Sequence, residues 1–335
     1  MKIISQNKQY SIVDINVDDL AAQLTLIDLP IFKSIKREEL INLGQSSHRS
    51  ARRQDLCPNI VAMNRQFNQV TFWVVGQILS HESARMRTDL ISHFIKTAKR
   101  LHQLNNLHST YAIVSALLSS PIYRLKGTWH LVRKKCPKEK YQLDKLRHTY
   151  SDNNNYELLR NHLATCNLPC IPYLGIYSRD IIYINEAHQE GTIQRSKSTS
   201  KILESIETFQ KSEYEDLTHI PYITRYLLSN RYIDELQKFV EDENYRRSLE
   251  LEPPAKTIMD QTSTDNHHKK PAMLLASFTS MVQLAFVTTS NKFGSSPLRG
   301  SSAELQKSNK YLIDDSYIHQ KNLIVAQDQI NHPAQ

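Results

Sequence analysis

Glycine is scarce in this chain, and the scarcity limits both its fold and its chemistry. Only seven glycines occur among 335 residues, whereas glycine makes up about 7% of an average protein. No two of them have the spacing of a phosphate-binding loop, so G-x-G-x-x-G and G-x-x-x-x-G-K-[ST] are both absent. An all-β fold needs many tight turns, which glycine commonly supplies. Together with twelve prolines, the scarcity of glycine predicts an all-α protein.

Charge and cysteine content narrow the classes of function. The formal net charge is +8, and a basic surface suits an anionic partner such as nucleic acid, a membrane surface or an acidic protein. The positive residues are spread along the chain, so an ordinary solvated surface is the simpler interpretation. Four scattered cysteines are too few for a disulfide framework, and no cationic-then-apolar signal segment opens the chain. We therefore expect a cytoplasmic protein.

Apolar residues recur at helical spacing over much of the chain. The clearest segments are 67–79, 86–101 and 111–118, and a later pair of segments lies within 226–240. Each would present an apolar face to a neighbouring helix. Pro121 is expected to stop the third of these helices. Because such faces need one another for burial, the stretches predict one large helical domain.

Changes in composition predict the domain boundaries. The helical domain is expected over residues 16–255, after a flexible lead-in of residues 1–15. Ser, Thr, Asn, Gln and Lys then dominate, which predicts a low-complexity, disordered tail over residues 256–335. The tail contains an apolar run, residues 273–288, that is shorter than the ~20 residues needed to span a bilayer. This run is either a collapsed segment of the tail or a helix that docks on a partner or a membrane surface.

Five blocks, in order along the chain, resemble one known family. They are AAQLTLIDLPIFKSI (21–35), NRQFNQVTFWVV (64–75), LNNLHSTYAIVSALLSSPIYRL (104–125), PCIPYLGIYSRDIIYINEA (169–187) and RYIDELQKFVEDENYRRSLELEP (231–253). Together they resemble the catalytic domain of Ras-type guanine-nucleotide exchange factors (RasGEF), and within that family the Ral exchange factors of the GPS type.

The resemblance implies an all-α domain that binds a Ras-family GTPase and inserts a helical hairpin at its nucleotide site. Exchange factor and nucleotide weaken each other's binding to the GTPase, so GDP leaves and GTP rebinds. No covalent bond changes, so the protein is not an enzyme in that sense, and no cofactor or metal is implied. Ral is the expected GTPase, with Rap and Ras as alternatives, and the anionic membrane where such GTPases reside is a further expected partner.

The resemblance also assigns roles to two residues of the expected hairpin helix, residues 177–187. Ile182 takes the place of the apolar side chain that occupies the magnesium site of the GTPase. Glu186, four residues later and on the same helix face, takes the place of the acid that overlaps the α-phosphate position. The alternative is structural: Ile181, Ile182 and Ile184 would be core residues, and Glu186 a solvated helix end.

Seven further positions match GTPase-contacting positions of the family. In the family, the arginine at the position of Arg65 grips the second switch of the GTPase, although an ordinary surface arginine is the default for an isolated one. Tyr156 follows a polar run, so we expect an exposed aromatic that suits an interface hot spot, with a helix-start tyrosine as the alternative. The full set of expected GTPase-binding residues is Arg65, Asn68, Leu118, Tyr156, Tyr173, Arg179 and Lys201.

The chain departs from the family pattern at several points. Leu118 stands where relatives carry Asn or Gln, which would weaken the GTPase contact or change its choice, and Gln45 stands where a Trp is usual. We expect the chain to lack the helical module that precedes the domain in many Ras exchange factors, as the GPS type does. No strands typical of a PH domain are evident in the tail, so the chain is expected to be a short form or a fragment.

Two other functions remain as alternatives. One is a helical scaffold that keeps the fold but lacks exchange activity, which Leu118 favours and intact Ile182 and Glu186 oppose. The other is a nucleic-acid binder, which we do not expect because no recognisable motif or interleaving of basic and aromatic residues is present. A zinc site is not predicted either: His162, Cys166 and Cys170 have four-residue spacing, but a proline intervenes and a fourth ligand is missing.

Overall fold

A computed structural model describes residues 11–45, 53–230 and 232–254, and within these residues the chain is built of helices without a β-strand. The prediction of an all-α fold is confirmed. The elements in chain order are η1 (Ile12–Asp14), α1 (Val17–Lys33), α2 (Arg37–Gln45), α3 (Arg53–Leu56), α4 (Pro58–Leu79), α5 (Ala84–Gln103), α6 (Leu107–Leu118), α7 (Ser120–Tyr123), α8 (Lys126–Lys135), α9 (Pro137–Thr149), α10 (Glu157–Thr165), α11 (Leu174–Ala187), α12 (Ile193–Phe209), α13 (Pro221–Ser229), η3 (Asp234–Leu236) and α14 (Gln237–Leu251).

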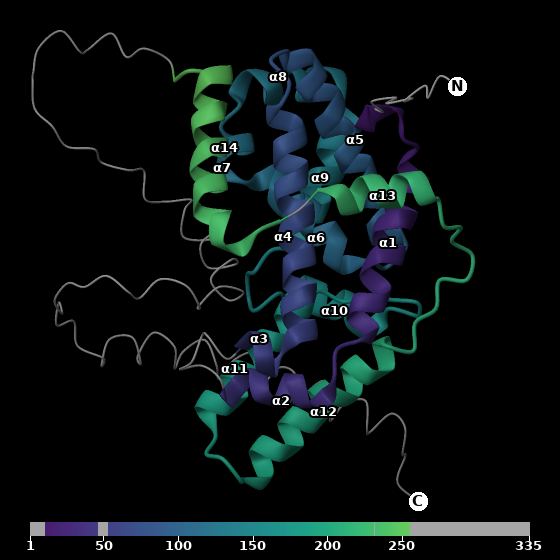
Figure 1. Cartoon of the computed structure of the whole chain (residues 1–335), viewed down its shortest axis with the longest axis vertical. Helices are drawn as coiled ribbons and strands as arrows, with labels where there is room; N and C mark the ends of the chain where they lie inside the picture. Colours follow the sequence, from purple (N-terminus) through teal and green to yellow (C-terminus); the bar gives the residue numbers. More distant parts are fainter. Residues whose placement is uncertain (1–10, 46–52, 231, 255–335) are drawn as a thin grey trace, which may run out of the picture.

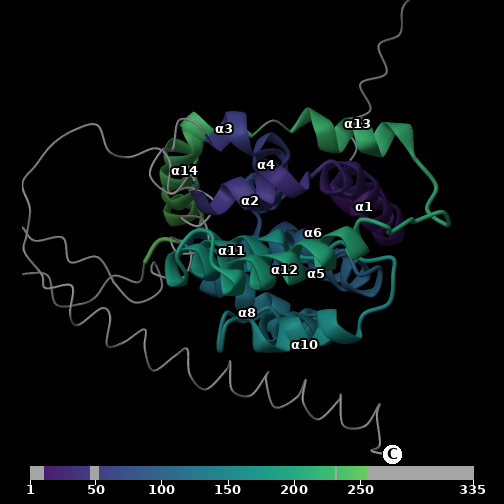
Figure 2. The same cartoon turned by 90° about the horizontal axis from the view of Figure 1, so that it is seen from below.

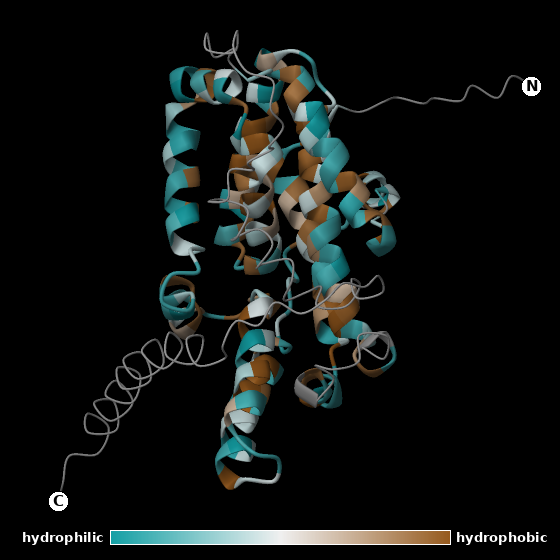
Figure 3. Ribbon diagram, turned by 90° about the vertical axis from the view of Figure 1, so that its left-hand side faces the viewer, coloured by the Kyte–Doolittle hydropathy of each residue, from teal (hydrophilic) through white to brown (hydrophobic). Residues whose placement is uncertain are grey.

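Helix α6 lies at the centre of the domain (Figures 1 and 2). All its residues from Leu107 to Leu117 are buried, while α4 and α5 pack against it and α1 packs against α5. Figure 3 shows the resulting distribution, with apolar residues gathered between the helices and polar residues on the outer side. The predicted stretches 67–79, 86–101 and 111–118 lie within α4, α5 and α6, and α6 ends before Pro121 as expected.

The later pair of predicted segments, within residues 226–240, lies in separate elements as expected, but it is not buried throughout. It is divided among α13, η3 and α14, and Ile233, Leu236 and Phe239 are 50%, 47% and 63% exposed. The turn at η3 interrupts the helical spacing, and α14 packs against α4 and α7 through other side chains. The prediction that these three residues are buried is therefore wrong.

A buried carboxyl group joins three helices of the core. Asp28 of α1 accepts hydrogen bonds from Gln66 Nε2 of α4 at 3.0 Å, from Asn106 Nδ2 at 2.8 Å and from the hydroxyl of Ser109. Burial raises the pKa of Asp28 to about 6, and the three hydrogen bonds act in the opposite direction without cancelling that effect. The network fixes α1 against α4 and against the start of α6.

The end of α14 is fixed to α8, at the opposite end of the molecule from α12 (Figure 1). The Glu252 carboxylate accepts from the backbone N–H groups of Gly127 and Thr128 at 2.8 and 3.0 Å, and from Nη2 of the buried Arg87 at 2.9 Å. Arg124 donates to the Glu252 carbonyl at 2.9 Å. A carboxylate at the first turn of α8 also complements the dipole of that helix.

The structure describes part of the predicted N-terminal lead-in but none of the predicted C-terminal tail. Within the predicted lead-in, Ile12 and Ile15 are buried and η1 packs against α5. The predicted tail, with its apolar run at 273–288, lies outside the described residues. No helix in the described part of the chain combines the length and the apolar character needed to cross a membrane.

Candidate functional site

Helices α11 and α12 form a hairpin that reaches the lower end of the molecule (Figures 1 and 3). Gly191 in the connecting loop has φ +81°, a conformation that glycine adopts without a Cβ clash. The Thr192 hydroxyl then accepts from the Arg195 backbone N–H at 3.4 Å and caps the start of α12. The expected hairpin helix, residues 177–187, lies within α11.

The base of this hairpin is tied to the core by backbone hydrogen bonds. Ile171 exchanges two of them with the loop between α5 and α6: its N–H donates to the Asn105 carbonyl, and its carbonyl accepts from Leu107, each at 2.9 Å. Beyond α12, the Ser212 hydroxyl accepts from the Cys170 N–H at 2.8 Å and contacts the Cys170 carbonyl at 3.0 Å. The segment that enters the hairpin is therefore bonded to the core, and the segment that leaves it is bonded to the entering one.

A bidentate ion pair joins the middle of α11 to α10. Arg160 of α10 donates to both carboxylate oxygens of Asp180, at 2.8 and 2.7 Å, and to the Asn155 carbonyl at 2.7 Å. Such a fork-to-carboxylate pair sets orientation as well as distance. We did not expect this pair from the sequence, because its members lie on different helices and share no local spacing.

Ile182 and Glu186 follow Asp180 on α11. Ile181 is fully buried, whereas Ile182 is only partly buried at the edge of the core and Glu186 is exposed. The structural alternative thus holds for Ile181, while Ile182 and Glu186 keep surface available to a partner. Their roles at a magnesium site and at an α-phosphate stay predictions.

Tyr156 and Tyr173 belong to a buried aromatic cluster. Their ring centroids lie 6.0 Å apart, and those of Tyr111 and Phe67 lie 4.7 and 5.6 Å from that of Tyr173. The expectation that Tyr156 is an exposed aromatic is therefore wrong. Burial raises the pKa of both phenols, and the positive charge of Arg179 acts in the opposite direction on both. The cluster joins α4, α6 and α10 to the first turn of α11.

The remaining predicted contact residues differ in exposure. Arg179 on α11 and Lys201 on α12 are exposed, whereas Leu118 at the end of α6 is partly buried against the core. Arg179 lies near the aromatic cluster, because its charge acts on the phenols of both Tyr156 and Tyr173. Lys201 lies on the second helix of the hairpin.

Arg65 and Asn68 face a segment that we did not expect at this site. Arg65 Nε donates to Asp234 Oδ2 at 2.6 Å, with the two side chains 42% and 19% exposed. Asn68 is buried and donates to the Tyr232 hydroxyl at 3.4 Å, and Phe72 stacks on the Tyr232 ring at 5.5 Å. Residues 65, 68 and 72 form one stripe of α4, so the turn around η3 lies along that stripe.

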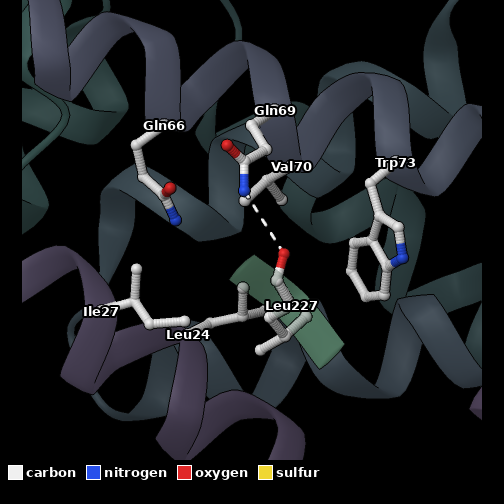
Figure 4. Close-up of a pocket in the computed structure, with 7 residues that line it drawn as sticks. All are labelled: Leu24, Ile27, Gln66, Gln69, Val70, Trp73 and Leu227. Carbon is white, nitrogen blue, oxygen red and sulfur yellow. Dashed lines mark hydrogen bonds between the residues drawn. The ribbon is translucent and has the colours of Figure 1, made fainter. Parts of the chain in front are cut away.

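A small pocket lies between α1, α4 and α13 in the described residues. Its volume is about 10 Å³, about the size of one water molecule, and the Gln69 amide donates to the Leu227 carbonyl across it (Figure 4). Its lining is Leu24, Ile27, Gln66, Gln69, Val70, Trp73 and Leu227. Among the residues that the structure describes, no group of three or more His, Cys, Asp or Glu could hold a metal ion.

Comparison with known proteins points to one family. The model of the RasGEF domain matches residues 19–202. The chain is 44% identical over 251 residues to the Ras-specific guanine nucleotide-releasing factor RalGPS1 of Mus musculus, which covers 73% of the chain and 42% of that relative. It is 41% identical over 263 residues to the factor RalGPS2 of Homo sapiens, covering 77% and 44%.

More distant matches carry related names. The Ras-specific guanine nucleotide-releasing factor 2 of Danio rerio is 36% identical over 241 residues, which cover 70% of the chain and 18% of that protein. The aligned region thus spans less than half the length of each of these relatives.

Proposed function

The chain belongs to the RasGEF family, and we propose that it is a guanine-nucleotide exchange factor that acts on a Ras-family GTPase, most specifically Ral. Two relatives of 41–44% identity are named RalGPS1 and RalGPS2, which supports Ral, while the same names begin with "Ras-specific", so Ras stays the alternative GTPase. The protein would promote GDP release and GTP loading without a covalent step and without a cofactor of its own.

In this proposal, α11 enters the nucleotide site of the GTPase. Ile182 supplies an apolar side chain at the magnesium position, where the cation otherwise holds oxygen ligands. Glu186, one turn later, brings a negative charge to the position of the α-phosphate and repels it. Arg65, Asn68, Leu118, Tyr156, Tyr173, Arg179 and Lys201 are proposed to form or support the surrounding contact surface.

The observation that carries the proposal is the anchored hairpin. Arg160 holds Asp180 on α11 by a bidentate ion pair. The segment that enters the hairpin is bonded to the core, and the segment that leaves it is bonded to the entering one. A wedge must keep its shape while it displaces a bound nucleotide, because binding energy is otherwise lost in ordering the wedge itself. The partly buried Ile182 and exposed Glu186 lie beyond these anchors.

Release of labelled GDP from purified Ral, Rap and Ras, measured with and without the full chain, tests this function. We expect the largest acceleration with Ral. If the chain binds a GTPase but accelerates release from none of the three, the protein is a scaffold of RasGEF fold, the alternative that Leu118 favours. Absence of both binding and release would overturn the proposal.

The place of action is part of the same proposal. We place the protein in the cytoplasm, with peripheral recruitment to the plasma membrane, where its GTPase would be anchored. The formal net charge of +8 supports attraction to an anionic surface.

A further inference from the structure

The positive charge of the chain is concentrated in one pair of helices. Residues 126–149, which form α8 and α9, carry eight Lys or Arg and two Asp or Glu. This short segment accounts for six of the eight formal net charges of the protein. Although positive residues occur along the whole chain, this segment is especially rich in them, and α8 and α9 pack against each other.

Both carboxylates of this pair are already engaged. Glu139 pairs with Lys96 of α5 at 3.6 Å, and Asp144 pairs with Lys140. Seven cations of the pair have no carboxylate partner among the described residues, and all seven are exposed: Lys126, Arg133, Lys134, Lys135, Lys138, Lys145 and Arg147. We call these seven residues the cationic face.

The packing of the two helices makes the cationic face point outward. Trp129 and Val132 of α8, and Leu143 and Leu146 of α9, are buried, and both helices pack against α5. Figure 2 shows α8 and α10 in an outer layer, on the opposite side of the molecule from α3 and α13. The charges therefore occupy the free side of that layer.

An aromatic side chain lies among these charges. Tyr141 is 58% exposed, and the Lys145 ammonium group lies 4.8 Å from the centre of its ring. A ring with an apolar body and a polar tip, flanked by long cationic side chains, suits the boundary between lipid headgroups and acyl chains.

We propose that the cationic face, with Tyr141, docks the protein on an anionic phospholipid bilayer. Five of its seven cations are lysines, which act as point charges towards many anionic groups rather than as bidentate forks for one ligand. A fluid surface of anionic headgroups complements such a face, because each basic residue near it adds to the attraction. No residue of the candidate GTPase site lies on α8 or α9, so docking leaves that site uncovered. The inference rests on the proposed function only for its effect on exchange.

Vesicle sedimentation of the full chain tests the docking. We expect pelleting with phosphatidylcholine vesicles that contain phosphatidylserine and little pelleting with phosphatidylcholine alone. The variant with Lys134→Glu, Lys135→Glu and Lys138→Glu should lose at least about tenfold in membrane affinity, since it reverses three charges of the face. The matched control changes the same net charge at exposed positions elsewhere, with Lys36→Glu, Lys211→Glu and Arg225→Glu, and should lose much less. Thermal melts establish that both variants are folded.

Three results of the sedimentation experiment would overturn the docking proposal. Equal losses in the two triple variants would show that net charge alone acts and would overturn the proposal, as would binding to neutral vesicles as strong as to anionic ones, or binding to neither. GDP release from a soluble GTPase is measured in parallel. It should be unchanged in the Lys134, Lys135 and Lys138 variant, whereas release from a vesicle-anchored GTPase should slow. A chain that pellets but releases no GDP from either would refute the exchange function and leave the docking intact.

Discussion

Arg65 and Asp234 form an ion pair of 2.6 Å between the first half of α4 and the turn before α14. The guanidinium group that the RasGEF resemblance assigns to the second switch of a GTPase is thus held by a carboxylate of the same chain. A GTPase carboxylate that binds Arg65 would have to replace Asp234.

We predict that Asp234→Asn increases the affinity of the protein for its GTPase. A partly exposed ion pair contributes about 0.2–1 kcal/mol, so freeing Arg65 should lower the half-saturating concentration in the GDP-release assay by up to about fivefold. The maximal rate should not change, because ground-state and transition-state binding gain equally. Asp242→Asn on α14, which removes the same charge outside this contact, should have no effect.

Arg65→Ala provides the reciprocal test. It should raise the half-saturating concentration, with the rate recovering at high concentration of the exchange factor. In that background Asp234→Asn should change nothing further, since its effect acts through Arg65. A weaker interaction in the single Asp234→Asn variant would mean that the carboxylate positions Arg65 for the GTPase instead of competing with it.

Ile182→Ala should lower the maximal rate of GDP release even at saturating exchange factor, since the group lost acts in the transition state. Because Ile182 is only partly buried, its truncation should cost about 1 kcal/mol, below the range of about 2–5 kcal/mol for a fully buried isoleucine. Ile181→Ala, at the fully buried neighbour, is the matched control and should show that larger loss. Glu186→Ala should reduce the rate less than Ile182→Ala. An Ile182→Ala protein as unstable as Ile181→Ala would identify Ile182 as a core residue.

Gly175→Ala should destabilise the protein. A Cβ at this position would overlap the ring of Tyr173, which is buried in the aromatic cluster and has little room to move. Overpacking of this kind costs about 1–3 kcal/mol. Gly76→Ala in α4 is the control, because a Cβ there meets nothing within 4 Å and alanine favours a helix over glycine by up to about 1 kcal/mol. Thermal or urea unfolding should show opposite signs for the two variants; equal signs would contradict this account.

Asp28 should make stability depend on pH. Its pKa is raised to about 6 in the folded protein, so between about pH 4 and pH 6 the folded state binds more protons than the unfolded state. The contribution of this group to the free energy of unfolding should therefore fall as pH rises through that range and be level above it. Asp28→Asn should remove this slope. Urea unfolding of both proteins at several pH values measures the difference, and identical slopes would show that Asp28 does not titrate there.

The helices of the core could be predicted because each has a local pattern of apolar residues at helical spacing. The apolar spacing in 67–79 and 86–101 needs only a neighbouring helix, and α6 supplies one for both. The same signal misled at Ile233, Leu236 and Phe239, since periodicity indicates an apolar face without saying what covers it.

The site depends on contacts that local patterns do not encode. Arg160 with Asp180, and Arg65 with Asp234, join separate elements, so no spacing rule finds them. Tyr156 follows polar residues that suggested exposure, yet Asn154, Asn155 and Tyr156 have φ of 48°, 57° and 61°. Such a run of left-handed conformations is rare for residues other than glycine. The local sequence therefore did not indicate the backbone path on which the tyrosine ring is buried.

The bonds of Glu252 have a mechanical consequence. The carboxylate accepts hydrogen bonds from α8 and from Arg87 of α5, and Arg124 donates to the carbonyl of the same residue. A pull on the chain beyond Pro254 would therefore load α5, α7 and α8, at the end of the molecule away from α12 (Figure 1). None of these bonds involves the hairpin of α11 and α12. A tether on the C-terminal side of the domain would therefore act first on helices other than those that would face the nucleotide.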